Sequence, residues 1–273
     1  MPVEPSVFLQ VVAVTNGFFI KPLYMLLMLF AAWRLHARGG AEARALAWGV
    51  DLFLLGEVFC AVNYLVFGMM APAVEMLHGL GMALGTGLIM LGLSTLIDAK
   101  MLFFLDPDKP CALLRACPSC AKKTDAACGL ERVFLFLALA LAVANLMPLM
   151  GPLRPFKKEL LIFGACVCQY HTTFLQVFEY RVYPIVGSAL FLVSFGILLR
   201  GGRPAVRVAK FPFCMAVGFL VFPLLRFFTL HAYFDNLIWA EFWEEITELM
   251  LICGIIIFLR SFRLVGEPDQ PCF

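Results

Sequence analysis

The chain is 273 residues long, 62% hydrophobic and only 15% charged, with a net charge of +2 and a mean hydropathy of +0.91. Soluble domains are nearer half apolar and a quarter charged, so this composition excludes an ordinary soluble domain and predicts a helical membrane protein. The length accommodates seven or eight spans of about 20 residues with short loops. We therefore expect residues 1–273 to form a single all-α, polytopic transmembrane helix bundle.

The first expected span, residues 11–33, is interrupted by Lys21 and Pro22. A proline is tolerated inside a membrane helix because neighbouring groups can satisfy the carbonyl that it frees. Lys21 is costly in the hydrocarbon region, and we expect its long side chain to extend toward the outer interface. The sequence begins without the basic region of a cleavable signal peptide, so this segment is expected to remain as a span.

The next two expected spans cover residues 46–70 and 74–97. The first of them carries Glu57 near its middle, where a carboxyl group either belongs to a proton or ion pathway or is buried in its neutral form. The second carries His78 near its start. Gly81 and Gly85 follow at the spacing that allows a partner helix to approach closely.

Residues 98–132 form the long polar insertion of the sequence, expected as a cytoplasmic loop. Its cysteines follow the pattern C-x5-C-x2-C-x7-C and are Cys111, Cys117, Cys120 and Cys128. Thiols in the cytoplasm stay reduced, and a CxxC pair can grip a tetrahedral zinc ion, so a structural zinc site is one prediction. Only one pair has the tight spacing, which leaves an iron–sulfur cluster and unligated cysteines as alternatives.

Four further spans are expected at residues 133–150, 184–199, 211–229 and 239–260. On a helical wheel, residues 156–183 are amphipathic, with Cys166, Gln169, Thr172, Thr173 and Gln176 on one face. This pattern predicts an amphipathic or re-entrant helix on the outer side, in addition to seven spans. The alternative is that this segment crosses the membrane, which would give eight spans.

The distribution of basic residues predicts the orientation. Fifteen of the 21 Lys and Arg residues lie in four segments: 34–44, 98–132, 200–210 and 260–263. Loops rich in Lys and Arg stay in the cytoplasm, so we expect the N-terminus outside and the C-terminus in the cytoplasm. This arrangement requires an even number of crossings between residues 132 and 200.

The last expected span carries an unusual group of carboxyl groups at its start: Glu241, Glu244, Glu245 and Glu248. At about 100° per residue these four side chains share one face of a helix, and Trp239 and Trp243 point the opposite way. Tryptophan favours the headgroup level of a membrane, so the carboxyl groups are expected to face the interior of the bundle.

In this topology His78, Arg226 and His231 lie at depths similar to those of the four glutamates. Arg226 is expected to pair with Glu245 or Glu248, either as a structural ion pair or as part of a polar pocket open to the outside. A set of histidines and carboxylates also suits zinc, iron or manganese, although no HExxH spacing is present. The candidate ligand-binding or ion-pairing residues are Glu57, His78, Arg226, His231, Glu241, Glu244, Glu245 and Glu248.

The sequence contains no P-loop, GxSxG or dinucleotide-binding motif, and no basic, aromatic-interleaved stretch typical of nucleic-acid binding. We predict an integral inner-membrane protein that binds a small ligand or cation in an outward-facing polar pocket, for transport or for signalling to a cytoplasmic or membrane protein partner. Alternatives are a membrane-embedded metalloenzyme acting on lipid or redox substrates, and a structural subunit of a membrane complex. The pattern assigns no catalytic residue.

Overall fold

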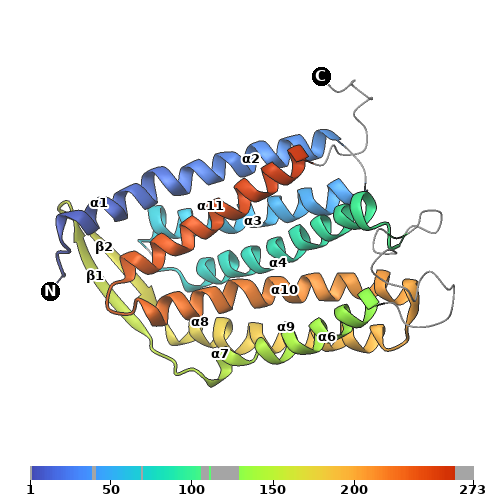
Figure 1. The fold of residues 1–273 in the computed structure, drawn as a ribbon. Coiled ribbons are helices and arrows are strands. Elements are labelled where there is room, and N and C mark those ends of the chain that lie inside the picture. The colour runs from blue at the N-terminus through green and yellow to red at the C-terminus, as the bar shows by residue number, and fades with distance from the viewer. Residues whose placement is uncertain (1, 39–40, 69, 106–110, 112–128, 262–273) are drawn as a thin grey trace.

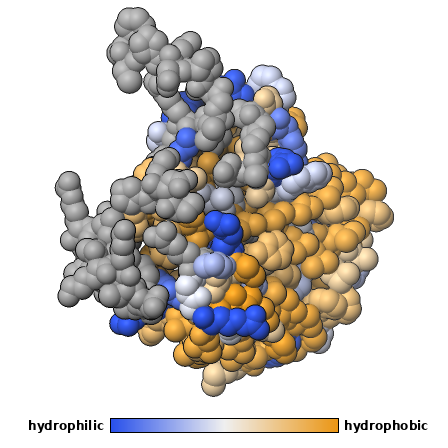
Figure 2. Space-filling model, turned by 90° about the vertical axis from the view of Figure 1, so that its right-hand side faces the viewer, coloured by the Kyte–Doolittle hydropathy of each residue, from blue (hydrophilic) through white to orange (hydrophobic). Residues whose placement is uncertain are grey.

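The computed structural model describes residues 2–38, 41–68, 70–105, 111 and 129–261. Long helices lie side by side in a bundle, and a short β-hairpin lies across one end of it (Figure 1). Six helical segments are long and apolar enough to cross a membrane: Val7–Ala37, Ala43–Phe67, Pro72–Leu102, Gly129–Met150, Thr173–Leu198 and Pro204–Ala232. Apolar side chains cover much of the described flank of the bundle (Figure 2). These features are those of a multi-pass membrane protein.

The first crossing helix is continuous although it contains a proline. Helix α1 (Val7–Thr15) leads through a π-helical turn, η1 (Asn16–Ile20), into α2 (Lys21–Arg38). Pro22 cannot donate a backbone hydrogen bond to the preceding turn, and a wider turn is a common way for a helix to absorb such a defect. The prediction that the proline is tolerated within a helix is confirmed.

Helices α3 (Ala41–Phe67) and α4 (Pro72–Ile97) pack closely against each other. A Cβ atom at Gly81 would lie 2.7 Å from the Cα atom of Gly56, and one at Gly85 would lie 2.6 Å from the backbone nitrogen of Phe53. The predicted close approach at the two glycines of α4 is therefore confirmed. This close approach brings the backbone of α4 next to the turn of α3 that carries the buried residue Glu57.

The second half of the bundle consists of α6 (Gly129–Ala144), α7 (Met147–Met150), α9 (Tyr183–Leu198) and α10 (Gly202–Ala232). Buried Phe191 lies in the apolar core that joins α6, α9 and α10. The Ser188 hydroxyl donates to the carbonyl of Ala142 across α9 and α6, and the Asn145 amide donates to the carbonyl of Pro184. These polar contacts hold helices together inside an apolar core.

The segment between α7 and α9 begins with an antiparallel hairpin of β1 (Phe156–Ile162) and β2 (Ala165–His171). The two-residue turn Phe163-Gly164 has positive φ values of 45° and 83°, as a tight hairpin turn requires. Val3 pairs with β1 through backbone hydrogen bonds to Glu159 and Leu161, so the N-terminal segment forms a single parallel β-bridge with the hairpin.

The predicted amphipathic or re-entrant helix over residues 156–183 is therefore wrong for residues 156–171, whereas residues 173–182 are helical, and neither seven nor eight spans are confirmed. Burial alternates over the last four residues of β2, where Gln169 and His171 are turned inward, which is the period of a strand. The chain becomes helical at α8 (Thr173–Val177), where the Thr172 hydroxyl accepts from the backbone N–H of Leu175. A π-helical turn, η4 (Phe178–Val182), joins α8 directly to α9.

The last helix, α11 (Leu237–Ser261), runs along the bundle and packs against α2 and α10 (Figure 1). Its carboxyl groups set it apart from the apolar helices, and it is not among the six segments above. Trp243 is 43% exposed on the outer face, and Glu248, Ile252 and Ile255 are buried on the inner face. The predicted division between an outward tryptophan and inward glutamates is confirmed for these side chains.

Candidate functional site

Two groups of charged side chains lie inside the bundle near the hairpin. We call the first the Lys21 cluster; its members are Lys21, Tyr24, Glu57, Glu245 and Glu248. We call the second the Arg226 cluster; its members are Glu75, His171, Glu179, Arg226 and Glu244. Each group combines residues from distant parts of the sequence, so the site exists only in the folded bundle.

In the Lys21 cluster, one ammonium group and one hydroxyl group each contact two carboxyl groups. Lys21 Nζ lies 2.5 Å from Glu57 Oε2 and 2.9 Å from Glu245 Oε1. The Tyr24 hydroxyl oxygen lies 2.6 Å from Glu57 Oε2 and 2.5 Å from Glu245 Oε2. These contacts join α2, α3 and α11, and Lys21 points into the bundle. The expectation that Lys21 extends to the outer interface is therefore wrong.

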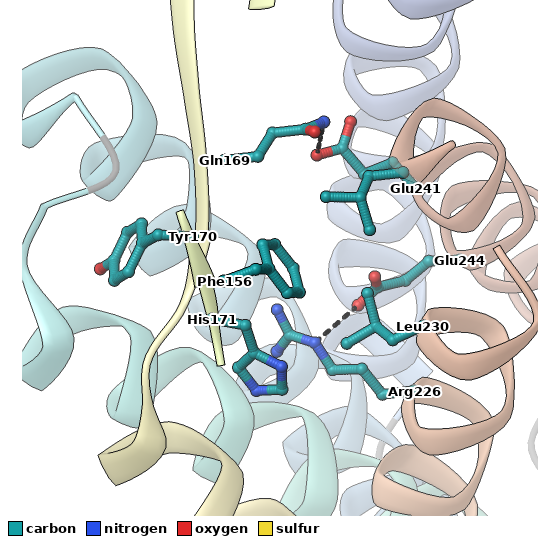
Figure 3. A pocket seen from close by; sticks show the side chains of 9 residues that line it. Phe156, Gln169, Tyr170, His171, Arg226, Leu230, Glu241 and Glu244 are labelled. Carbon is teal, nitrogen blue, oxygen red and sulfur yellow. Dashed lines mark hydrogen bonds and ion pairs between the residues drawn. The ribbon is translucent and has the colours of Figure 1, made fainter. Parts of the chain in front are cut away.

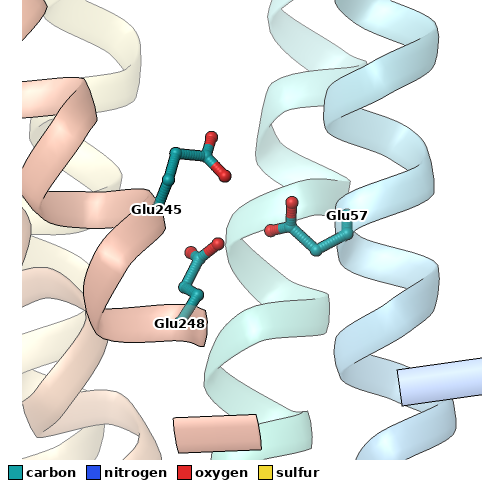
Figure 4. A group of neighbouring side chains, drawn as sticks. All are labelled: Glu57, Glu245 and Glu248. Atoms are coloured by element: carbon teal, nitrogen blue, oxygen red, sulfur yellow. The ribbon is translucent and has the colours of Figure 1, made fainter. Parts of the chain in front are cut away.

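The third carboxyl group of the cluster belongs to Glu248, one turn further along α11. Figure 4 shows the side chains of Glu57, Glu245 and Glu248 directed toward one another. One carboxyl oxygen from each lies within 4.8 Å of the other two. Within the part of the chain that the structure describes, Glu57 Oε1 and Glu248 Oε2 are buried without a hydrogen-bond partner.

In the Arg226 cluster, the guanidinium group meets carboxyl groups from three elements. Its Nη2 lies 2.8 Å from Glu75 Oε1, its Nη1 lies 2.9 Å from Glu179 Oε1, and its Nε lies 3.8 Å from Glu244 Oε1. His171 Nε2, at the end of β2, lies 2.9 Å from Glu179 Oε2. Arg226 was expected to pair with Glu245 or Glu248. That pairing is wrong, because Lys21 occupies the neighbourhood of Glu245.

Glu75 also accepts a hydrogen bond from the side chain of Asn63. The Asn63 amide nitrogen lies 3.1 Å from Glu75 Oε2, and the Asn63 amide oxygen accepts from the backbone N–H of Ala71. Asn63 also lies 3.4 Å from the hydroxyl of Tyr170 in β2. The Arg226 cluster thus ties the hairpin to α3, α4 and α10 through buried ion pairs and hydrogen bonds.

A small pocket lies beside the Arg226 cluster, between β2 and the start of α11 (Figure 3). Its volume is about 50 Å³, and Gln169, His171, Arg226, Glu241 and Glu244 supply its polar lining. The Gln169 amide donates to Glu241 Oε1 over 2.6 Å. Roughly 30 Å³ is one water's share of liquid volume, and sites for organic ligands are typically 300–1,000 Å³, so this pocket suits water or an ion.

The two predicted histidines, His78 and His231, face backbone carbonyls. His78 Nδ1 lies 3.0 Å from the carbonyl oxygen of Gly56, and 3.7 Å from Glu57 Oε1. His231 Nδ1 lies 2.8 Å from the carbonyl oxygen of Phe227. Neither histidine belongs to the group of Glu57, Glu245 and Glu248 that could hold a metal ion. The described residues therefore do not assemble the set of histidines and carboxylates that a zinc or iron enzyme would use.

The structure thus brings Glu57, Glu245 and Glu248 together, and it places Glu241, Glu244 and Arg226 around the neighbouring pocket. The predicted site residues did not include Tyr24, Glu75, Glu179 or His171. Glu75 and Glu179 carried a usable signal, since an acidic residue at the start of an apolar helix needs a partner. Tyr24 carried none, because a tyrosine in an apolar helix is ordinary.

The predicted zinc site falls mostly outside the described residues, since Cys117, Cys120 and Cys128 are not among them. Cys111 is described and is buried in an apolar cluster with Phe104 and Leu198. Nothing in the described part of the chain bears on zinc at this loop.

No family model, no curated protein and no solved structure matches the sequence.

Proposed function

We propose that the protein is an inner-membrane protein that binds a cation from the outer side through the carboxyl groups at the hairpin end of its bundle. The bound cation would serve transport, or a signal passed along the helices toward the opposite end. The observation that carries this proposal is the excess of acidic groups in the two clusters and the adjoining pocket.

The carboxyl groups in question are Glu57, Glu75, Glu179, Glu241, Glu244, Glu245 and Glu248. Only Lys21 and Arg226 are permanently basic among the described side chains that contact them. An ionised carboxyl group without compensation is costly in a low-dielectric interior. The surplus of acid therefore favours uptake of positive charge, and the small volume of the pocket favours an ion over an organic ligand.

For the topology, we propose seven crossings, with α11 as the last. Its 25 residues would extend about 37 Å at 1.5 Å per residue, enough to span a hydrocarbon core of about 30 Å. Its glutamates would be tolerated because they face the interior of the bundle.

For the orientation, we propose that the hairpin end faces outside. The ends of α2 and α11 and the start of α10 lie at the opposite end of the bundle (Figure 1), and η2 follows the end of α4; these segments carry Arg34, Arg260, Arg207 and Lys100, respectively. Single cysteines at Lys157 and Arg207, both exposed, should react with an impermeant thiol reagent from opposite sides of a sealed vesicle. Labelling of both from one side would contradict this orientation.

The cation proposal can be tested by unfolding the purified protein at increasing concentrations of Na⁺, Ca²⁺, Mn²⁺ or H⁺. A cation that binds only the folded state raises its stability with concentration. We expect at least one of these ions to stabilise the wild type, and this stabilisation to be reduced in Glu241→Gln. Glu4→Gln, at an exposed carboxylate, is the matched control. The proposal fails if all of these ions, protons included, affect the wild type and Glu241→Gln equally.

The cysteines of the loop at residues 98–132 remain a proposed structural zinc site, and the same loop is the proposed contact for a cytoplasmic partner. Metal analysis of purified protein should find zinc that is lost in Cys117→Ser with Cys120→Ser. Zinc that persists in this double variant would contradict the assignment.

A further inference from the structure

The hydroxyl group of Tyr24 lies between two carboxyl groups but carries one proton. Its oxygen is 2.6 Å from Glu57 Oε2 and 2.5 Å from Glu245 Oε2, so both contacts are within hydrogen-bonding distance and the second is short. An ionised carboxylate can only accept, and the hydroxyl can donate to one of the two. The second hydrogen bond therefore needs a proton on a carboxyl group, so either Glu57 or Glu245 is an acid.

The contacts of Lys21 indicate which of the two is ionised. The ammonium group lies closest to Glu57 Oε2, the same oxygen that Tyr24 approaches. A carboxyl oxygen that accepts hydrogen bonds from both an ammonium group and a hydroxyl group is stabilised in its ionised form. Glu57 is then the carboxylate, and the proton lies on Glu245 Oε2, which donates to the oxygen of Tyr24.

Glu248 supplies an independent observation that points to a proton. Its side chain is 7% exposed and is directed toward Glu57 (Figure 4). In the described residues its Oε2 has no hydrogen-bond partner, and neither does Glu57 Oε1, which lies 3.7 Å from His78 Nδ1. The nearest histidine does not supply a donor, because His78 Nδ1 lies closer to the carbonyl oxygen of Gly56. An ionised Glu248 would be a buried charge without a counter-ion, whereas a protonated one is neutral.

We propose that the Lys21 cluster is a proton store and relay, in which Glu245 and Glu248 hold protons and Tyr24 connects Glu245 to Glu57. The cation of the proposed function is then a proton, and the connection of the Lys21 cluster to the outer side rests on that proposed function. The titratable groups that face the relay are Lys21 and Tyr24 from α2, Glu57 and Cys60 from α3, His78 from α4, and Glu245 and Glu248 from α11.

The relay step transfers one proton along two hydrogen bonds. The O–H bond of Glu245 breaks as its proton moves to the oxygen of Tyr24, and the hydroxyl proton of Tyr24 moves to Glu57 Oε2. Tyr24 is neutral before and after the step, and the carboxylate charge passes from Glu57 to Glu245. Lys21 contacts both carboxyl groups, so its ammonium balances the charge in either state.

Helix α11 connects this relay to the pocket beside the hairpin. Glu241 lines the pocket and is four residues before Glu245, so the two side chains follow one another on the same face of the helix. A proton that enters the pocket from the outer side and reaches Glu241 would therefore find Glu245 one helical turn deeper.

Infrared spectroscopy of the purified protein tests the proposal, because a protonated carboxyl group has a C=O stretch that an ionised one lacks. We expect acid bands in the wild type at neutral pH, with one band lost in Glu245→Gln and another in Glu248→Gln. In Tyr24→Phe the Glu245 band should remain and shift to higher frequency, since the acid has lost its acceptor. Tyr64→Phe, at a 43% exposed tyrosine of α3, should leave all bands unchanged.

The spectra and the cation titration separate two kinds of failure. If no acid band responds to Glu245→Gln or Glu248→Gln while Na⁺, Ca²⁺ or Mn²⁺ still stabilises the protein, the proton relay is overturned and the cation function stands. If no acid band responds and no cation stabilises the protein, both are overturned. An acid band that is lost in Glu245→Gln but is unmoved in Tyr24→Phe overturns the relay through Tyr24.

Discussion

The Lys21 and Arg226 clusters each place one basic side chain among three glutamates, yet they satisfy these glutamates differently. Arg226 presents separate nitrogens to Glu75 and Glu179, and Asn63 supplies a further donor to Glu75. In the Lys21 cluster, by contrast, the ammonium group of Lys21 and the hydroxyl group of Tyr24 are each shared between Glu57 and Glu245. Among the described residues, each cluster leaves some buried polar atoms without a hydrogen-bond partner, and in the Lys21 cluster these include Glu248 Oε2.

The difference indicates different roles for the two clusters. A guanidinium group is planar and always charged, with donors in fixed directions, so the Arg226 cluster holds the hairpin and helices in one arrangement. The ammonium group of Lys21 is a compact charge that can serve either neighbouring carboxyl group. The first cluster is suited to a structural lock, and the second to an exchangeable ion.

The largest effect is expected from Arg226→Met. This change leaves Glu75 and Glu179 buried without their cation, and breaking a buried ion pair by removing one partner costs about 3–5 kcal/mol. The free energy of unfolding, measured with denaturant in a fixed detergent, should fall by this amount. Arg154→Met, at an exposed arginine beside the hairpin, should change it by less than about 1 kcal/mol. Equal losses in the two variants would contradict a structural role for Arg226.

A smaller loss is expected from Lys21→Met, about 1.5–3 kcal/mol, because a proton can replace the lost ammonium on Glu57. The double variant Lys21→Met with Glu57→Gln should recover most of this loss, since it removes the charge that Lys21 balances. The matched control is Lys157→Met, at an exposed lysine. A double variant as unstable as the sum of the single variants would contradict the pairing.

The smallest effect is expected from Tyr170→Phe at the edge of the Arg226 cluster. The hydroxyl of Tyr170 lies 3.4 Å from the Asn63 amide, so its loss removes one weak, neutral hydrogen bond, worth about 0.5–1 kcal/mol. Burial raises the pKa of Tyr170 above its usual value, so the hydroxyl is protonated at neutral pH in either environment. A loss of stability as large as that of Lys21→Met would show that the hairpin contributes more than this contact.

Much of the bundle could be predicted from the sequence because apolar segments of about 20 residues have few alternatives. The acidic face of α11 was predictable for the same reason, since helical periodicity fixes which side chains share a face. Gly81 and Gly85 correctly indicated the close approach of α3 and α4.

Other features depend on contacts that local periodicity does not contain. The hairpin was missed because polar residues such as Gln169 and Gln176 fell on one face of a helical wheel, although Gln169 lies in a strand and Gln176 in a helix. The partners of the basic residues were missed because packing selects them. Lys21 meets Glu245 across 224 positions of sequence, and Arg226 meets Glu75 across 151.

The contrast between the two clusters can be measured directly by solution NMR of protein with ¹³C-labelled glutamate carboxyl groups, because the carboxyl shift reports protonation. The resonances can be assigned by single Glu→Gln variants. At neutral pH we expect Glu245 and Glu248 to resonate as carboxylic acids, and Glu75 and Glu179 as carboxylates. All four resonating as carboxylates would contradict a proton-holding Lys21 cluster, and all four as acids would contradict an ion-paired Arg226 cluster.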